Sequence, residues 1–472
     1  MTKQPNILFL IMDDQRADSL DWDFVQTPAL DRLAAEGMRF RNQFVHVPIC
    51  TPGRAECLTG CHGYRNGVMW FNTPIEPSRI LMPQAFQQAG YHTMHVGKWH
   101  NDGHPRDKGY DRVRLNMHDA DDFFTTYKKK GHWLTFSDDD GRHTEGHSTE
   151  IFTQAAMDEI AAAPAAKPWF CWLALHSPHD PFGCPEPFQS LYQRPDFPLP
   201  PAWQAMPAVD NGDLTIRDEL LLPHPRPLET GRRNFANYAA MITHHDYWLG
   251  RLFERLRASG QWENTIVCFT SDHGLAVGSH GFLGKESMYD HSCRVPCILR
   301  GPGIPAGRAT ERLSTSADLF PTLCEVADIP IPDSVADGRS LLPLFNSAAS
   351  PVRDAVFSAF RSPQMVNGEK QLLDTQRNVR TETHKLNWYP MSGRMQLFDL
   401  RHDPLEQDDL LQPWRLQDDP IWGYRPPAEK NSVMAVAEAL KNTLIAFLAS
   451  QGDPLAESLA SCDDFLPERT RK

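Results

Sequence analysis

The sequence lacks the features that mark membrane-spanning, secreted or nucleic-acid-binding proteins. Its first apolar run, residues 6–12, is too short for a bilayer and has no small-residue cleavage site after it. We therefore expect no export signal, no membrane association and a cytoplasmic location. The net charge of −13 also disfavours nucleic acid as a partner, because a broadly acidic surface repels phosphates.

The ten cysteines are scattered singly and show none of the regular spacing of a disulfide framework. Without an export signal, we expect them to be reduced thiols. Cys57, Cys61 and His62 form a conceivable zinc site, but no second pair of ligands follows them. The sequence also contains no internal repeat and no glycine-rich nucleotide fingerprint.

What remains is the composition of an ordinary globular protein, with 41% hydrophobic and 23% charged residues. Short apolar runs alternate with helical patterns, which predicts a mainly parallel sheet with helices on both faces. Residues 27–36 predict one such helix, and 237–257 predict a long amphipathic one. The predicted strands cover residues 6–12, 91–100, 169–176, 265–270 and 295–299.

Two regions depart from this alternation. Residues 182–235 are rich in proline and charge with little periodicity, and we expect an insertion over the sheet edge. After residue 350 the pattern changes to short strands, at 380–389 and 395–400, and a helix with an apolar stripe from Val433 to Leu448. Although 472 residues suggest about three domains, large α/β domains exceed that size. We predict a catalytic domain, 1–350, and a smaller α+β subdomain, 351–472.

The segment Cys50-Thr51-Pro52-Gly53-Arg54 is the most informative stretch of the chain. Pro52 suits the first turn of a helix, where its missing N–H costs nothing. Residues four apart share a helix face, so Arg54 should lie beside Cys50. The helix N-terminus and the guanidinium both favour an anion next to this thiol. A buried structural cysteine with a chance proline and arginine is the alternative.

Two predicted strands end in acidic residues. Asp13 and Asp14 follow the strand 6–12, while Asp272 and His273 follow the strand 265–270. Ligands of open α/β sheets bind at this carboxyl edge, and the set suits a hard divalent cation. An isolated Asp-Asp pair is usually a solvated turn. Two acidic strand ends in one sheet favour a metal site instead.

Further candidates are basic. Lys98 and His100 would share one face of a strand, an arrangement that suits an anion undergoing proton transfer. His179 is flanked by Pro178 and Pro181, which restrict its backbone. Lys285 supplies one more cation. Each of these residues alone would more often be a packed histidine or a solvated lysine, so only their combination is informative.

Together these motifs resemble, in type and order, those of the type I sulfatases of the alkaline phosphatase superfamily. The resemblance covers about residues 6–410 and includes the Cys-x-Pro-x-Arg signature at Cys50. The other matching segments are Asp13-Asp14, Thr27 to Asp31, Gly97 to His100, His176 to His179, Thr270 to Gly274, Gly284-Lys285, Arg294 to Pro296, Gly301 to Gly303, Asp318 to Thr322, Asp337 to Leu341, Leu397 to Leu400 and Asp403-Pro404.

The resemblance implies an alkaline-phosphatase-like α/β fold and hydrolysis of sulfate monoesters. Cys50 would be oxidised to formylglycine by a formylglycine-generating enzyme, and its hydrate would attack sulfur. The implied ligands of one divalent cation are Asp13, Asp14, Asp272, His273 and the modified Cys50. Calcium is usual, but the imidazole of His273 departs from an all-oxygen shell and also suits manganese.

The same resemblance implies roles for the basic residues. Arg54, Lys98 and Lys285 would neutralise the sulfate oxygens. His179, assisted by Lys285, would protonate the leaving alcohol. His100 would accept a proton from the second hydroxyl of the hydrate, so that sulfate departs as the aldehyde re-forms.

Two alternatives stay open. A phosphonate monoester hydrolase or phosphodiesterase of the same superfamily would use the same nucleophile, and a binding protein on a degenerate scaffold would leave Cys50 unoxidised. The sequence favours a small sulfate ester as substrate but does not distinguish sugar, aryl and alkyl esters. The oligomeric state, including a homo-oligomer, is equally open.

Overall fold

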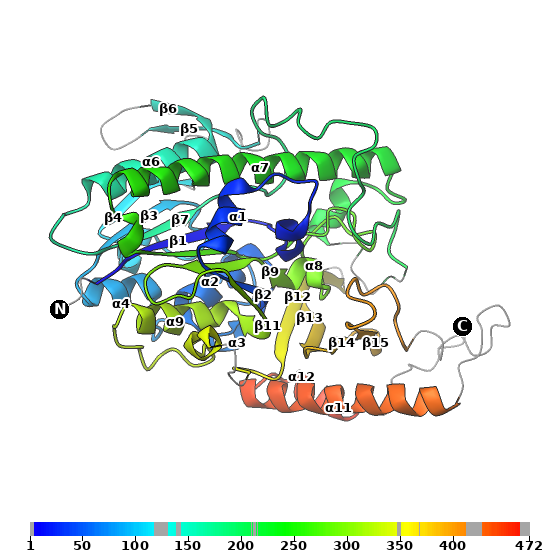
Figure 1. Ribbon diagram of the computed structural model, residues 1–472. Helices are drawn as coiled ribbons and strands as arrows, with labels where there is room; N and C mark the ends of the chain where they lie inside the picture. Colours follow the sequence, from blue (N-terminus) through cyan, green and yellow to red (C-terminus); the bar gives the residue numbers. More distant parts are fainter. Residues whose placement is uncertain are drawn as a thin grey trace.

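The fold is built on one large sheet, shown in Figure 1 by a computed structural model. It describes residues 4–117, 131–137, 143–208, 210, 214, 216–346, 351–367, 369–411 and 427–462. Nine strands form the sheet, in the order β11-β2-β10-β8-β1-β7-β3-β4, with β9 paired to β2. These strands are β1 (Asn6–Met12), β2 (Met38–Phe44), β3 (His92–Gly97), β4 (Arg112–Asn116), β7 (Trp169–Ala174), β8 (Thr265–Ser271), β9 (Arg294–Val295), β10 (Cys297–Arg300) and β11 (Arg308–Thr315).

Strand β1 lies at the centre of the sheet, parallel to β7 on one side and β8 on the other. Its apolar side chains alternate between two cores. Ile7, Phe9 and Ile11 belong to the core on one face, and Leu8 and Leu10 belong to the core on the other. This period of two explains why the strand reads as a continuous apolar run: both of its faces are buried.

Helices cover both faces, as the alternating pattern predicts (Figure 1). On one face lie α1 (Pro28–Ala35), α6 (Ser148–Ala162) and α7 (Leu228–Ala258). On the other lie α2 (Cys50–Thr59), α4 (Met82–Gln88) and α9 (Leu319–Val326). The short elements are α3 (Gly63–Asn66), α8 (Asp290–Cys293) and a hairpin of β5 (Trp133–Ser137) with β6 (His143–His147). The prediction of a mainly parallel sheet between helices is confirmed, with β9 and β10 antiparallel to their neighbours.

Four predicted boundaries were wrong. The predicted strand 380–389 is interrupted at residues 381–383. The predicted strand 91–100 ends at Gly97, whose φ is 98°, so Lys98 and His100 do not share a strand face. The predicted strand 295–299 is divided at Pro296, which cannot donate to a ladder. Helix α7 begins at Leu228 and therefore takes in the end of the predicted insertion 182–235. Most of that insertion is turn and loop, with a 3₁₀ turn at Arg217–Leu221.

The C-terminal part forms a second, antiparallel sheet. Its strands are β12 (Val356–Val366), β13 (Glu369–Arg380), β14 (His384–Tyr389) and β15 (Arg394–Asp399). Helix α11 (Pro427–Gln451) packs on it with α12 (Leu455–Ala460), and together they enclose a separate apolar core. The α+β character of this region is thus confirmed, while the boundary at residue 350 stays a prediction.

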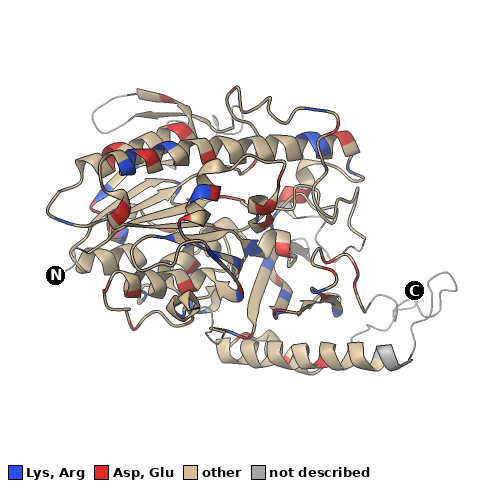
Figure 2. Ribbon diagram, viewed as in Figure 1, with Lys and Arg blue, Asp and Glu red and all other residues tan. Residues whose placement is uncertain are grey.

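Helix α11 contains a stretch, Asn431–Gln451, that is long and apolar enough to cross a membrane. Its stripe of Val433, Leu440, Leu444 and Leu448 is buried against β13 and β14. Packing within the chain therefore accounts for this stripe. Charges of both signs are distributed over the rest of the molecule, for example along α7 (Figure 2).

Candidate active site

The site lies where the central strands of the large sheet end. Asp13 follows β1, and Asp272 follows the neighbouring β8 in parallel register. The N–H of Asp272 donates to the carbonyl of Met12 (3.1 Å), which joins the two strand ends. Asp14 then turns the chain in a left-handed conformation (φ 69°). The two residue pairs, Asp13-Asp14 and Asp272-His273, thus meet at one point, as the sequence predicts, and all four side chains are fully buried.

Helix α2 carries Cys50 to the same point. It starts at Cys50, so the first turn, with its free N–H groups, borders the thiol. Gly53 is required here because a Cβ on this residue would lie 2.2 Å from the carbonyl oxygen of Asp272. The glycine of the signature therefore lets α2 approach the end of β8, while Arg54 lies one turn further along the same face.

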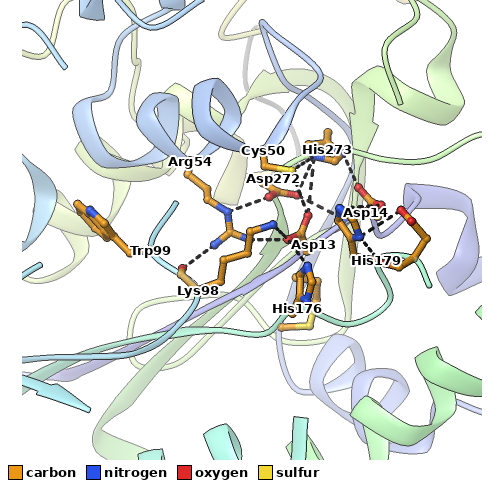
Figure 3. Close-up of polar contacts among 12 residues, drawn as sticks. Asp13, Asp14, Cys50, Arg54, Lys98, Trp99, His176, His179, Asp272 and His273 are labelled. Atoms are coloured by element: carbon orange, nitrogen blue, oxygen red, sulfur yellow. Dashed lines mark hydrogen bonds and ion pairs between the residues drawn. The ribbon is translucent and has the colours of Figure 1, made fainter. Parts of the chain in front are cut away.

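Each of two carboxylates uses its oxygens differently (Figure 3). Asp13 Oδ2 pairs with Lys98 and Asp272 Oδ2 accepts from Arg54 Nε (2.9 Å). Their Oδ1 atoms turn the other way: Asp13 Oδ1 lies 3.5 Å from the sulfur of Cys50, and Asp272 Oδ1 lies 3.5 Å from Nε2 of His273. One oxygen of each carboxylate is thus bound by a protein cation, and the other faces a common centre.

That centre suits a metal ion. One atom each from Asp13, Cys50, Asp272 and His273 lie within 4.8 Å of one another, and a second such group joins Asp13, Asp14, Cys50 and His179. In the part of the chain that the structure describes, both metal-competent groups include Cys50. The Cys57–Cys61–His62 alternative is not among them.

His273 presents a defined nitrogen to this centre. Its Nδ1 donates to the carbonyl of Gly274 (2.9 Å), which leaves Nε2 facing the sulfur of Cys50 (3.2 Å). A backbone acceptor on the distal nitrogen is the usual way to orient a ligating imidazole. Burial alone would lower the pKa of His273. The negative groups of Asp272, Cys50 and Asp14 outweigh burial and raise this pKa to about 10. The surroundings therefore favour positive charge where Nε2 lies.

The carboxylates report the same excess of negative charge. Burial, only partly offset by Lys285, raises the pKa of Asp14 to about 7, and burial followed by Asp13 raises the pKa of Asp272. Burial also disfavours the charge of Asp13, but Lys98 holds its pKa well below the usual range. A divalent cation near Asp14 and Asp272 would lower the pKa values of both carboxyl groups and so favour their charged forms. The donor set therefore fits such an ion.

A second group of basic residues adjoins the carboxylates. Lys285 Nζ lies 3.1 Å from Asp14 Oδ1 and 3.1 Å from Nε2 of His179. His179 donates from Nδ1 to the carbonyl of Asp180 (2.5 Å), so Nε2 is the acceptor of a Lys285 proton. Burial and then Lys285 hold the pKa of His179 well below the usual range. The proton of this pair therefore resides on the lysine side.

The predicted residues fall into two sets. Nine are joined by the contacts above: Asp13, Asp14, Cys50, Arg54, Lys98, His179, Asp272, His273 and Lys285. His100 differs, because its backbone is left-handed (φ 53°) and its ring stacks on Phe71 with 5.6 Å between centroids. Its role as a proton acceptor stays a prediction.

Sequence reasoning missed two residues that adjoin the site. His176 Nε2 lies 3.8 Å from Asp13 Oδ2, and its ring is 4.6 Å from that of His179. Its position at the end of β7, next to β1, was a usable signal. Asp218 Oδ2 lies 3.4 Å from Lys285 Nζ, but it comes from the aperiodic insertion and no pattern marked it.

Comparison with known proteins places this site in a family. Residues 5–329 match the Sulfatase family profile, and residues 278–418 match the family described as N-sulphoglucosamine sulphohydrolase, C-terminal. The arylsulfatase of Clostridium perfringens is 29% identical over 454 residues, which cover 86% of this chain and 90% of that protein.

Solved structures show the same fold. The phosphonate monoester hydrolase of Agrobacterium radiobacter superposes with a TM-score of 0.74 at 24% identity, over 95% of this chain and 96% of that one. An enzyme in complex with its substrate D-glucosamine-2-N,6-O-disulfate superposes with a TM-score of 0.73 at 22% identity, over 96% of this chain and 99% of that one. Since the family profile covers more than half of the chain and its motifs converge at Cys50, the chain belongs to the sulfatase family of the alkaline phosphatase superfamily.

Proposed function

We propose that this protein hydrolyses sulfate monoesters to an alcohol and inorganic sulfate, with residue 50 at the reacting centre. The observation that carries the proposal is the grouping of Cys50 with Arg54, Lys98 and the Oδ1 oxygens of Asp13 and Asp272, which face Cys50 and His273. Positive groups fixed around a tetrahedral anion stabilise the charge that develops during transfer of the sulfuryl group.

One divalent cation would be held by Asp13, Asp14, Asp272, His273 and residue 50. We propose calcium, which prefers carboxylate oxygens, with manganese as the alternative because His273 contributes an imidazole. The cation would supply positive charge next to the sulfate oxygens.

Cys50 would be oxidised to formylglycine by a formylglycine-generating enzyme. The modified residue would supply a hydroxyl nucleophile on a carbon that can later re-form a carbonyl. The chain places this residue at the first turn of α2, where backbone N–H groups and Arg54 favour an anion.

The leaving alcohol would receive its proton from the Lys285–His179 pair. Lys285 bears the proton, and its 3.1 Å contact with His179 Nε2 provides a short path toward the departing oxygen. Lys98 and Arg54 would bind the sulfate from the other side. His100 would take up a proton when sulfate is released.

The residue 50 chemistry can be tested on the purified protein. Mass analysis of the peptide containing Cys50 should show conversion of the thiol to the aldehyde. Cys50→Ser should lose turnover or retain a covalent sulfate, since serine has a single hydroxyl and cannot collapse to an aldehyde. Cys57→Ser, on the same helix and equally buried, is the matched control and should keep its activity. Full activity in Cys50→Ser would contradict the proposal.

A parallel assay separates the closest alternative. Phosphonate monoesters and phosphate diesters, like sulfate monoesters, present a tetrahedral centre with one negative charge, so the same cations could bind them. We expect kcat/KM to be highest on an aryl sulfate. A higher value on a phosphonate monoester would assign the protein to that activity instead.

We further propose a cytoplasmic protein that acts on a small sulfate ester and binds neither nucleic acid nor membrane. All ten cysteines are free thiols in the structure, which suits a reducing compartment. Cell fractionation with a thiol-labelling assay would test this, and recovery in a secreted fraction would contradict it.

A further inference from the structure

Lys285 lies on a segment without regular secondary structure, although its amine must be placed accurately between Asp14 and His179. We call residues 283–290, which end at the first residue of α8, the lysine loop. On one side, Oε1 of Glu219 accepts hydrogen bonds from the backbone N–H groups of Leu283 (2.9 Å) and Gly284 (2.8 Å). Gly284 packs so closely there that a Cβ would lie 2.7 Å from the side chain of Asp218. The start of the loop is thus fixed by the insertion.

The rest of the lysine loop is bound by the C-terminal sheet, which Figure 1 shows next to α8. Gln376 Nε2 donates to the carbonyl of Glu286 (3.0 Å), and Asn378 Nδ2 donates to the carbonyl of Met288 (3.2 Å). Arg380 Nε lies 3.4 Å from the carboxylate of Asp290. Positions 376, 378 and 380 of β13 therefore meet positions 286, 288 and 290 of the loop.

This register follows from strand geometry, since alternate side chains of a strand share a face. We call Gln376, Asn378 and Arg380 the polar face of β13. Val379 points to the other face and packs in the core beneath α11. A register shift opposite Phe360 and Arg361 precedes Gln376, and such bulges re-aim the side chains that follow.

Burial makes these contacts consequential. Gln376 is fully buried and Asn378 is 2% exposed, although both are amides in a sheet that has an apolar core. Buried amide groups are retained where their hydrogen bonds are made, because leaving them unpaired is costly. The side-chain oxygen of Asn378, Oδ1, accepts a hydrogen bond from the N–H of Ser358 (2.7 Å), which orients its Nδ2 toward Met288.

We infer that the polar face of β13 is a positioning element for catalysis, and that Gln376 sets the place of Lys285 through the carbonyl of the next residue. The inference rests on the proposed function, in which the Lys285–His179 pair protonates the leaving alcohol. The C-terminal sheet thereby contributes to proton transfer without touching substrate. Gln376 is a positioning residue.

The test compares two leaving groups. Gln376→Met keeps the length of the side chain but removes the donor, and Gln376→Glu keeps the shape but replaces the N–H donor with a carboxyl oxygen. An alkyl sulfate needs its leaving oxygen protonated, whereas 4-nitrophenyl sulfate does not. We expect both variants to lose about ten- to a hundredfold more kcat on the alkyl sulfate than on 4-nitrophenyl sulfate. Gln371 is exposed on the same strand, so the control variant Gln371→Met should keep its kcat on both substrates.

Amide hydrogen exchange supplies a readout without activity. In both Gln376 variants, exchange should rise in residues 283–290 and stay unchanged in β8. Equal loss on both substrates, or no loss, would overturn the inference while leaving the sulfatase proposal intact. A wild-type protein inactive on every sulfate ester would instead sink the proposed function and with it the inference. Unchanged exchange in the lysine loop would overturn the inference whatever the activity.

Discussion

Two buried clusters of carboxylates and cations lie at the ends of the segment 273–290. They differ in which positive group neutralises the carboxylates. In the joint cluster (Asp290, Arg380, Lys385 and Glu406), Lys385 Nζ lies 2.8 Å from Asp290 and 2.7 Å from Glu406. The chain itself thus supplies the ammonium between two carboxylates, and the cluster connects the C-terminal sheet to the large domain.

The metal cluster (Asp13, Asp14, Cys50, Asp272 and His273) is arranged the other way. Lys98 and Arg54 bind the outer oxygens of Asp13 and Asp272, whose inner oxygens face Cys50 and His273, while Lys285 contacts Asp14 from the other side. Two buried clusters of similar composition therefore serve different purposes. The joint cluster is complete within the chain, and we propose that the metal cluster is completed by a divalent cation.

The sharpest way to break this comparison is to remove one carboxylate from each cluster. Asp272→Asn removes a ligand charge and the partner of Arg54. We expect it to lose bound metal and to lower turnover about 1000-fold, because charge stabilisation at the reacting centre is lost. Metal content by elemental analysis and turnover of an aryl sulfate are the measurements. Asp290→Asn should keep a full complement of metal, and equal metal loss in both variants would refute the distinction.

Asp290→Asn should instead act on stability. Burial disfavours the charged form, but Lys385, Arg380 and Arg294 hold the pKa of Asp290 below its unfolded value of 3.8. A carboxylate with a lowered folded pKa stabilises above the unfolded pKa, and that contribution is lost as pH falls through the folded pKa. At pH 7 we expect the variant to lose about 3–5 kcal/mol, the cost of leaving buried cations without their partner.

Measuring unfolding over a range of pH tests whether the charge of Asp290 stabilises the fold. Urea unfolding of wild type and Asp290→Asn should show the gap in free energy narrowing as pH falls below 3.8. A gap that is constant from pH 7 to pH 3 would show that Asp290 acts by packing alone. Asp399→Asn, at a surface ion pair with Arg401, is a control that should change stability by less than about 1 kcal/mol.

Sequence patterns were sufficient for the metal cluster because its members are placed by regular elements. Asp13 and Asp272 follow buried strands and Cys50 begins a helix, so their meeting was predictable from the elements, whereas their role as ligands came from the family resemblance and stays a prediction. His100 shows the limit. The strand ends at Gly97 and a left-handed residue follows, so the two-residue alternation assumed for Lys98 and His100 does not apply.

The joint cluster and the polar face of β13 were beyond such reasoning for another reason. Gln376 meets Glu286 across 90 positions, and Lys385 meets Asp290 across 95. Nothing local in either segment indicates its partner, since buried amides and lysines read as exposed positions. The C-terminal α+β region was predicted correctly, but its contribution to the Lys285 site depends on how two sheets pack.

The smallest effect should come from Asp218. Its Oδ2 lies 3.4 Å from Lys285 Nζ, the same amine that contacts Asp14. A bound sulfate competes with this carboxylate for the ammonium, so Asp218→Asn should lower KM for a sulfate ester about threefold and leave kcat nearly unchanged. Asp196→Asn, exposed in the same insertion, is the matched control. Asp218 and Lys285 are both buried, so salt should screen this interaction only weakly and the difference in KM should persist as salt rises. A KM that rises in Asp218→Asn would mean that this carboxylate accepts a hydrogen bond from the substrate, and Asp218 would then belong with the residues that bind the leaving group.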